Sequence, residues 1–271
     1  MPAMAALTLS ALKLYPLKSA AGIALAAARV DGRGLAGDRR WMVVDANRRF
    51  LTQRTHARLA LVSVASAADG LVLTAPGMPA LALRTPGASG APVRVQVWDD
   101  VCEAQPAGGE AEEWISGFLG ESCEIVHMSA QSHRTVGREG SAQASELSFA
   151  DAFPFLLLSE GSLEDLNRRL ERPVPMDRFR PNLVVRGCAP YAEDGWRLIR
   201  IGAIVFHVVQ PCVRCTTTTV DQATGERGKE PLATLATYRR DGNAVLFGQN
   251  LVHVGTGELR VGDGVTVLEG A

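Results

Sequence analysis

The sequence has almost no excess of charge of either sign. Lys and Arg together number 28, and Asp and Glu number 29, which gives a formal net charge of −1. Proteins that bind nucleic acid or an anionic membrane through their overall charge are strongly basic. We therefore expect neither nucleic acid nor a membrane surface as a partner.

A long apolar run and a targeting signal are also lacking. The uncharged stretch at residues 19–28 is short compared with the roughly 20 apolar residues that a membrane-spanning helix needs. Lys13, Pro16 and Lys18 interrupt the region before it, and no basic segment opens the chain. We interpret this region as part of the fold rather than as a signal peptide or an anchor.

Several cofactor motifs are absent as well. The sequence contains no Gly-rich dinucleotide fingerprint and no Walker sequence, which argues against Rossmann-type binding of NAD(P)H. The four-cysteine spacing of a ferredoxin is missing too. The five histidines show no i, i+4 pair and no HExxH, so we assign none of them a role.

Cysteines are few, and two of them form the most informative motif. Five cysteines without a framework spacing favour a reducing compartment, which we take to be the cytoplasm. Cys212 and Cys215 flank Arg214 at the end of the β-branched run at residues 204–209. A thiolate is a soft metal ligand, and Arg214 can keep it charged or hold an anion. A metal ligand, a redox disulfide and an inert buried cysteine all remain open.

Short segments of β pattern separated by turn residues predict a mostly β protein with some α. Residues 6–15 alternate with one phase slip at Ser10-Ala11, which predicts a strand with a bulge. Further strands are expected at residues 41–44, 50–52, 59–64, 70–74 and 93–98. Such regular short strands are typical of a barrel or sandwich.

The second half of the chain mixes strands with helices. Apolar residues at helical spacing predict a helix over residues 111–119. The polar segment 128–145 is the expected interdomain loop. Beyond it we expect a buried strand at 153–158, a helix capped at Ser162, a strand within 178–185, hairpins at 198–206 and 259–267, and a helix that begins at Pro231.

Three segments carry a resemblance to a known family. Residues 211–225, the Lys-Glu-Pro-Leu at 229–232 and the Leu-Phe-Gly-Gln-Asn at 246–250 resemble the C-terminal half of MOSC-domain proteins. The likeness is to the two-domain kind that includes the mitochondrial amidoxime-reducing components and their bacterial relatives. It implies an N-terminal β-barrel domain at residues 1–127 packed on a MOSC β-barrel domain at residues 128–271.

The resemblance also implies a molybdenum cofactor, a molybdopterin whose metal is held by Cys215. Motifs of the form Tyr-Pro-x-Lys-Ser, Asp-Arg-x-Trp and Phe-Arg-Pro-Asn match the family's contacts to the cofactor. A terminal phosphate calls for cations, hydroxyls and N–H groups. The residues expected to bind the cofactor are Lys18, Ser19, Arg39, Arg180, Asn182, Arg214 and Cys215. Arg40 is not counted, because the relative compared has an aromatic residue there.

The activity implied by the resemblance is reduction of small N-oxygenated substrates such as N-hydroxylated amidines and hydroxylamines. Electrons are expected from an external protein of the ferredoxin or flavin reductase type. The alternative is a non-catalytic carrier of molybdenum cofactor or sulfur. A structural zinc site at Cys212 and Cys215 ranks last, because the sequence offers no convincing second pair of ligands. Asp221 is a weak acid–base candidate that is better explained as a turn residue.

Overall fold

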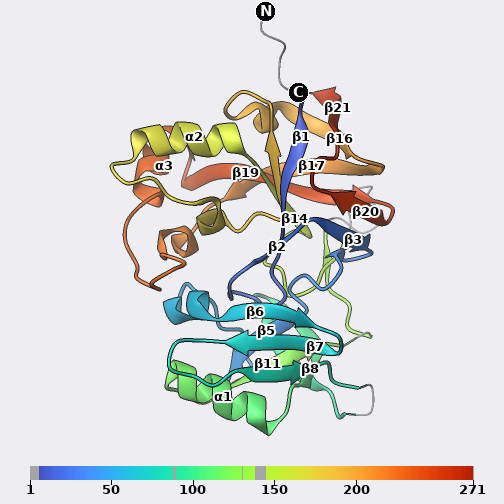
Figure 1. Ribbon diagram of the computed structural model, residues 1–271, viewed down its shortest axis with the longest axis vertical. Coiled ribbons are helices and arrows are strands. Elements are labelled where there is room, and N and C mark those ends of the chain that lie inside the picture. Colours follow the sequence, from blue (N-terminus) through green and yellow to red (C-terminus); the bar gives the residue numbers. More distant parts are fainter. Residues whose placement is uncertain (1–5, 88–89, 130, 138–144, 271) are drawn as a thin grey trace, which may run out of the picture.

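The chain forms two β-rich lobes, one above the other in Figure 1. The computed structural model describes residues 6–87, 90–129, 131–137 and 145–270. Strands predominate, with a few short helices, which confirms the predicted mostly β class. No described helix is both long enough and apolar enough to span a membrane.

The upper lobe is built on a nine-stranded sheet whose main path runs β2-β1-β15-β14-β19-β17-β16-β21. Backbone hydrogen bonds from Val265 to Leu7 and from Leu9 to Asp263, both 2.9 Å, bring the last strand back to the first, so the sheet closes. Its strands are β1 (Thr8–Leu14), β2 (Ile23–Leu25), β14 (Phe155–Ser159), β15 (Leu183–Arg186), β16 (Trp196–Ile201), β17 (Ile204–Val213), β18 (Arg240–Asp241), β19 (Ala244–Val254) and β21 (Val265–Gly270).

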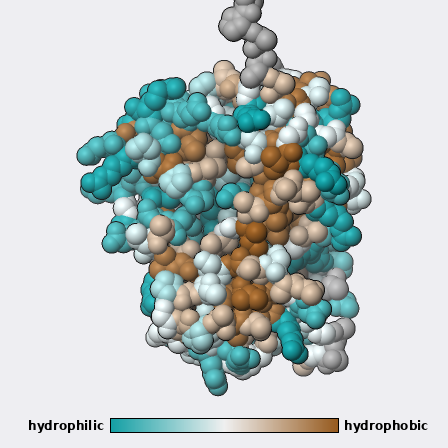
Figure 2. Space-filling model, in the orientation of Figure 1, coloured by the Kyte–Doolittle hydropathy of each residue, from teal (hydrophilic) through white to brown (hydrophobic). Residues whose placement is uncertain are grey.

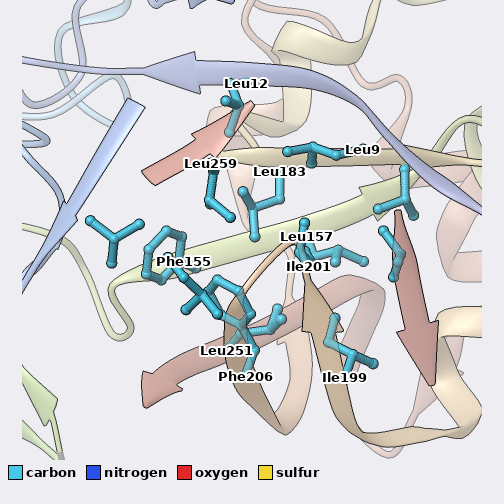
Figure 3. Packing of buried hydrophobic residues seen from close by; sticks show 14 of the residues in the cluster. Leu9, Leu12, Phe155, Leu157, Leu183, Ile199, Ile201, Phe206, Leu251 and Leu259 are labelled. Atoms are coloured by element: carbon cyan, nitrogen blue, oxygen red, sulfur yellow. The ribbon is translucent and has the colours of Figure 1, made fainter. Parts of the chain in front are cut away.

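Apolar side chains fill the interior of this barrel (Figure 3). Leu9, Leu183 and Ile199 are fully buried, because inward positions alternate with outward ones along each strand. The rings of Phe155 and Phe206 meet edge to face with centroids 5.2 Å apart. Two helices, α2 (Glu160–Arg169) and α3 (Leu232–Tyr238), lie on one side of the lobe in Figure 1.

The lower lobe combines two small antiparallel sheets with one helix. One sheet has the order β5-β11-β10-β9 and the other β6-β7-β8. Trp114, Ile115 and Phe118 of the helix are buried, as their helical spacing predicted. The elements are β5 (Trp41–Asp45), β6 (Ser63–Ala67), β7 (Gly70–Thr74), β8 (Leu81–Arg84), β9 (Val93–Val97), β10 (Asp100–Pro106), α1 (Gly109–Leu119) and β11 (Cys123–Met128).

Segments from both ends of the chain tie the lobes together. The strand β20 (Gly257–Arg260) pairs with β3 (Ala27–Asp31), which also pairs with β4 (Gly34–Leu35). β1 and β2 belong to the upper sheet although they precede the lower lobe in sequence. A short ribbon of β12 (Thr135–Val136) and β13 (Ser145–Glu146) completes the strands. The division at residue 127 stays a prediction.

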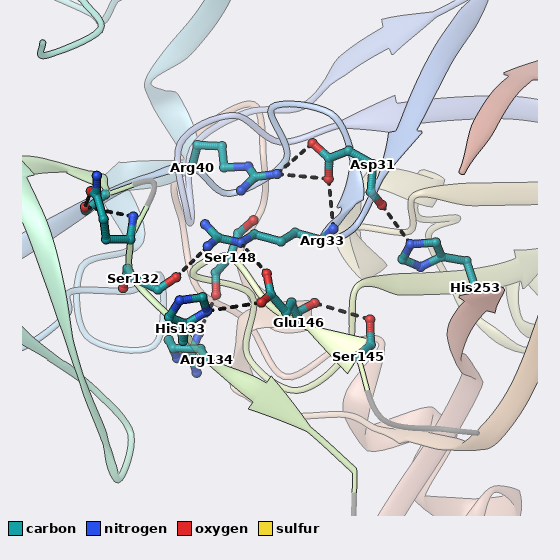
Figure 4. Close-up of polar contacts among 12 residues, drawn as sticks. Asp31, Arg33, Arg40, Ser132, His133, Arg134, Ser145, Glu146, Ser148 and His253 are labelled. Carbon is teal, nitrogen blue, oxygen red and sulfur yellow. Dashed lines mark hydrogen bonds and ion pairs between the residues drawn. The ribbon is translucent and has the colours of Figure 1, made fainter. Parts of the chain in front are cut away.

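A polar cluster lies where these connecting strands meet β19 (Figure 4). Arg40 donates hydrogen bonds to both carboxylate oxygens of Asp31, at 3.0 and 2.8 Å. The His253 ring is hydrogen-bonded to the backbone carbonyl of Asp31 at 2.7 Å, and Arg33 pairs with Glu146. On the face turned to the viewer, Figure 2 shows a band of apolar surface that continues from one lobe to the other.

Most local predictions are confirmed. The register of β1 against β15 shifts between Leu9 and Ala11, where the bulge was expected. The hairpin at residues 198–206 is formed by β16 and β17. The expected interdomain loop at 128–145 falls partly outside the described residues, and its described part contains β12.

Four local predictions are wrong. Residues 50–52 do not form a strand, and Phe50 makes only an isolated bridge with Val44. Residues 57–61 form the 3₁₀ helix η1 (Ala57–Leu61) rather than a strand, because a short buried apolar run fits either form. The residues of the expected 259–267 hairpin separate: β20 pairs with β3 and β21 with β16. Helix α2 is capped by Ser159, whose hydroxyl accepts from the Ser162 backbone N–H, so the true cap lies one turn earlier.

Candidate functional site

A cavity of about 250 Å³ lies where loops of the lower lobe meet the end of the barrel. Its lining comes from both halves of the chain: residues before position 55 and residues between 150 and 250. All seven residues expected to bind the cofactor line it: Lys18, Ser19, Arg39, Arg180, Asn182, Arg214 and Cys215. The structure therefore brings together side chains that three distant motifs had placed only in sequence.

Cys215 is one of the residues that line this cavity. Cys215 follows β17 and begins the 3₁₀ helix η4 (Thr216–Thr219), and its thiol is free. Burial works to raise the pKa of the thiol. The nearby Arg54 guanidinium and the hydroxyl and backbone N–H of Thr217 outweigh burial and leave the pKa lowered. A lowered pKa favours the thiolate, the form that binds metals.

Arg54 belongs to a chain of charged contacts along the cavity wall. Its guanidinium donates to Asp151 at 2.8 Å and lies 4.7 Å from the ring centroid of Trp98. Asp151 also pairs with Lys18, whose ammonium donates to the Phe149 carbonyl at 2.6 Å. Burial lowers the pKa of Lys18 to about 8, and the two cations hold the pKa of Asp151 far below its usual range despite burial.

A second group of cations surrounds Tyr15. The guanidinium carbons of Arg39 and Arg180 lie 4.6 and 4.3 Å from its ring centroid. Arg39 donates to Asn182 at 2.9 Å and also to the buried carboxylate of Asp38. Burial lowers the pKa of Arg180 to about 10 and raises that of Tyr15 to about 12. Both arginines have left-handed backbones, φ 47° and 58°, held by the turns that carry them.

Two buried arginine nitrogens have no hydrogen-bond acceptor among the described residues. They are Nη2 of Arg180 and Nε of Arg214. The rest of the Arg214 guanidinium is engaged, with Nη1 3.0 Å from the sulfur of Cys212 and Nη2 2.7 Å from the Phe179 carbonyl. A buried charged donor without an acceptor is costly. Both arginines line the cavity, so their unmatched charge fits a phosphate-bearing group there.

Two residues considered in the sequence lie outside this site. The side chain of Asp221 accepts the backbone N–H groups of Ala223 and Thr224, as expected for a turn residue. Arg40 is paired with Asp31 and is absent from the cavity lining. In the described part of the chain, no group of three or more His, Cys, Asp or Glu side chains is arranged to hold a metal ion.

Sequence reasoning missed three side chains at the site: Arg54, Trp98 and Asp151. Arg54 and Asp151 lie in polar loops and match no chemical motif, so nothing in their spacing marks them. Trp98 alone carried a signal, because an aromatic side chain directly before Asp99-Asp100 falls where a two-residue hairpin turn favours Gly, Asn or Asp. Each is defined by its neighbours in space rather than by its neighbours in sequence.

The closed barrel, with a thiol and a cationic cavity at its junction with a second β-rich lobe, defines a two-domain β-barrel protein. Comparison with known families specifies the class. The family "MOSC N-terminal beta barrel domain" matches residues 6–122, and the family "MOSC domain" matches residues 144–266.

Curated relatives match along almost the whole chain. Mitochondrial amidoxime-reducing component 1 of Mus musculus is 37% identical over 279 residues, covering 96% of this chain and 82% of its own. The human component 1 is 36% identical over 282 residues, with 96% and 83% covered. Component 2 of Bos taurus is 35% identical over 243 residues, with 86% and 72% covered. The chain belongs to the family of two-domain MOSC proteins that includes the amidoxime-reducing components.

Proposed function

We propose that this protein is a molybdenum-cofactor-dependent reductase of N-hydroxylated compounds that receives electrons from a partner protein. One observation carries the proposal: the thiol with the lowered pKa shares a cavity with five cationic side chains. These are Lys18, Arg39, Arg54, Arg180 and Arg214. The names of the relatives, which are amidoxime-reducing components, support the substrate class.

The residues of the cavity fit both the metal and the phosphate of the cofactor. Cys215 would be the protein ligand of the metal, since its surroundings favour the thiolate. Arg180 and Arg214 would receive the phosphate on nitrogens that otherwise lack an acceptor, and Arg39 with Asn182 would complete that wall. When bound, the cofactor supplies a metal centre that can take up and pass on two electrons.

The protons for the reaction would come from side chains of this protein. Reduction of an amidoxime breaks the N–O bond and consumes two electrons and two protons, giving an amidine and water. The electrons come from the partner protein. Lys18 holds a proton on Nζ with a pKa near 8, beside Asp151 and on the same wall as Arg54. Lys18 is therefore the side chain that we propose as the proton source at the cavity.

The test is metal and pterin analysis of the purified protein, together with turnover of an amidoxime by an artificial electron donor. We expect molybdenum and pterin near equimolar with protein, together with measurable turnover. The bound cofactor and the turnover should both be lost in Cys215→Ala. The control is Cys188→Ala, a half-buried cysteine outside the cavity, which should keep cofactor and activity. If the expression host does not load the cofactor, reconstitution with isolated cofactor replaces the first measurement.

Each other outcome has a definite meaning. Full activity in Cys215→Ala would refute the proposal, and zinc without pterin would also end it. A protein that binds cofactor but never turns over with the artificial donor would instead be a carrier of molybdenum cofactor or sulfur. We also propose a cytoplasmic location, which the five free cysteines support.

A further inference from the structure

Trp98 differs from the other tryptophans of the chain in its exposure. Its side chain is 43% exposed, whereas Trp41, Trp114 and Trp196 are at most 6% exposed. It occupies the two-residue turn between β9 and β10, where Asp100 pairs with Val97. A large aromatic ring is therefore presented to solvent from the tip of a hairpin.

The backbone of Trp98 carries strain. Its φ is 56°, in the left-handed region where Gly or Asn is favoured in a two-residue hairpin turn. A bulky side chain in this conformation is strained and persists only when its surroundings hold it. Here the ring packs on Phe50 with centroids 5.0 Å apart, and its indole N–H donates to Asp151 at 3.3 Å. Such strain is found most often at ligand sites.

Trp98 is connected to Cys215 through the side chain of Arg54. The guanidinium of Arg54 lies over the indole ring, and the same guanidinium is the charge that acts most strongly on Cys215. The anion-binding wall of Arg39 and Arg180 is grouped instead around Tyr15. The Arg54 guanidinium thus contacts the indole of Trp98 and also interacts with Cys215.

A surface depression adjoins the cavity. Trp98, Asp99 and Asp100 line it, and it shares Asp151 and Ala152 with the cavity. A molecule bound in this depression would lie beside the exposed indole. The Asp99 carboxylate beside the ring can accept the N–H groups of an amidoxime, and the part of the indole that Arg54 and Phe50 leave exposed can contact a conjugated plane.

We propose that Trp98 is a specificity-determining residue whose exposed indole binds the planar, conjugated part of an N-hydroxylated substrate, so that aryl amidoximes are preferred to small aliphatic hydroxylamines. This inference rests on the proposed function. It adds the substrate class and a residue outside the cofactor-binding set. The indole acts on substrate binding, so its removal should change KM more than kcat.

The experiment compares two substrates in three proteins with an artificial electron donor. Trp98→Gly removes the ring and suits the left-handed backbone, so the fold is retained. Trp98→Phe keeps an aromatic face. Arg48→Gly is the matched control, because Arg48 also has a positive φ, 62°, in a turn and lines neither the cavity nor the depression.

We expect kcat/KM for benzamidoxime to fall about tenfold in Trp98→Gly, the size of one aromatic contact, mainly through KM. The value for N-methylhydroxylamine should stay within about twofold of the unchanged protein, since that substrate has no conjugated plane to lose. Trp98→Phe should recover most of the loss, and Arg48→Gly should lose nothing. Equal losses for both substrates would overturn the proposal, because the ring would then act only through Arg54. No loss for either substrate would overturn it too.

Binding of benzamidine, the reduction product of benzamidoxime, is measured separately by NMR titration. The affinity should fall by a similar factor in Trp98→Gly and be restored in Trp98→Phe. If the unchanged protein reduces neither substrate, the proposed reductase function fails, and this titration still decides the role of Trp98. Equal affinity in all variants would then refute the aromatic platform.

Discussion

At the scale of single residues, the properties of Cys215 depend on a balance of opposing effects. Burial by itself disfavours the thiolate, and the lowered pKa results from Arg54 and Thr217. Arg214, which the sequence places next to Cys215, points instead to the sulfur of Cys212 and to the Phe179 carbonyl. The cation that matters most to the thiol is therefore not its neighbour in sequence.

Replacing Arg54 with Gln should raise the pKa of the Cys215 thiol, because the largest favourable charge is removed while burial remains. The rate of alkylation of Cys215, followed against pH in cofactor-free protein, should shift to higher pH. Arg58→Gln is the control, since Arg58 stacks on Phe118 away from the cavity. An unchanged profile in Arg54→Gln would show that Thr217 alone stabilises the thiolate.

His127 should make stability depend on pH. Burial, with a smaller effect from Arg40, lowers its pKa from 6.5 to about 4, and its ring lies 4.5 Å from that of Trp41. Between pH 4 and 6.5 the unfolded chain binds the proton and the folded chain does not, so its contribution to stability falls as pH falls through this window.

Replacing His127 with Asn should flatten this dependence. Urea unfolding of the two proteins at several pH values between 4 and 7 measures it. A slope that survives in His127→Asn would assign the effect to another group.

At the scale of elements, the long strand β19 determines much of the site. It lies between β14 and β17 in the barrel and places Asn250 at the cavity. Gly248, in its middle, has φ 81°, and a Cβ there would lie 2.8 Å from the Leu157 carbonyl oxygen and from the Leu158 side chain. The strand can approach β14 this closely only because residue 248 has no side chain.

Gly248→Ala should therefore destabilise the protein by about 3 kcal/mol, from backbone strain together with the clash. Gly242→Ala is the matched control: its φ is also positive, 55°, but its Cβ would meet open space. We expect the control to cost about 1 kcal/mol, since only the strain remains. Urea unfolding of both variants gives the difference, and equal losses would show that strain alone decides.

At the scale of the whole molecule, amide and guanidinium groups join the loop of Gln53 and Arg54 to the segment of Gln222 and Arg227. The side chains of Gln53 and Gln222 exchange two hydrogen bonds of 3.0 Å, and Gln53 is fully buried. Arg227 donates to the backbone carbonyls of Gln53 and Arg54, at 2.7 and 2.8 Å. These contacts hold the loop that carries Arg54 against the segment that carries Cys215.

Arg227→Ala should loosen this loop without touching the cavity lining. The alkylation profile of Cys215 should move in the same direction as in Arg54→Gln but less far, because Arg54 keeps its contact with Asp151. Arg227→Lys should restore part of the effect, since a lysine can donate to one carbonyl. The exposed Arg240 serves as the control in Arg240→Ala, and a shift of equal size there would show that the effect is general charge removal.

Local chemistry made part of this protein predictable from its sequence. The bulge in β1 and the hairpin of β16 and β17 follow from alternation and turn residues, which act over a few positions. Five of the seven expected cofactor residues were identifiable from three motifs that each place a cation at a strand end or turn, and Arg214 and Cys215 from the cysteine motif. The structure places all seven at one cavity, and their role in binding the cofactor stays a prediction.

Long-range packing decided the rest. The residues of the predicted C-terminal hairpin separate, because β20 completes a sheet with β3 while β21 closes the barrel. The contacts of Arg54, Asp151 and Trp98 near Cys215 join loops of different lobes, and no spacing in the sequence encodes such a meeting. The sequence alone thus determined the fold class and the cysteine with its candidate cations. Only the tertiary structure decided which charge lies beside the thiol, because adjacency in space depends on the packing of the two lobes.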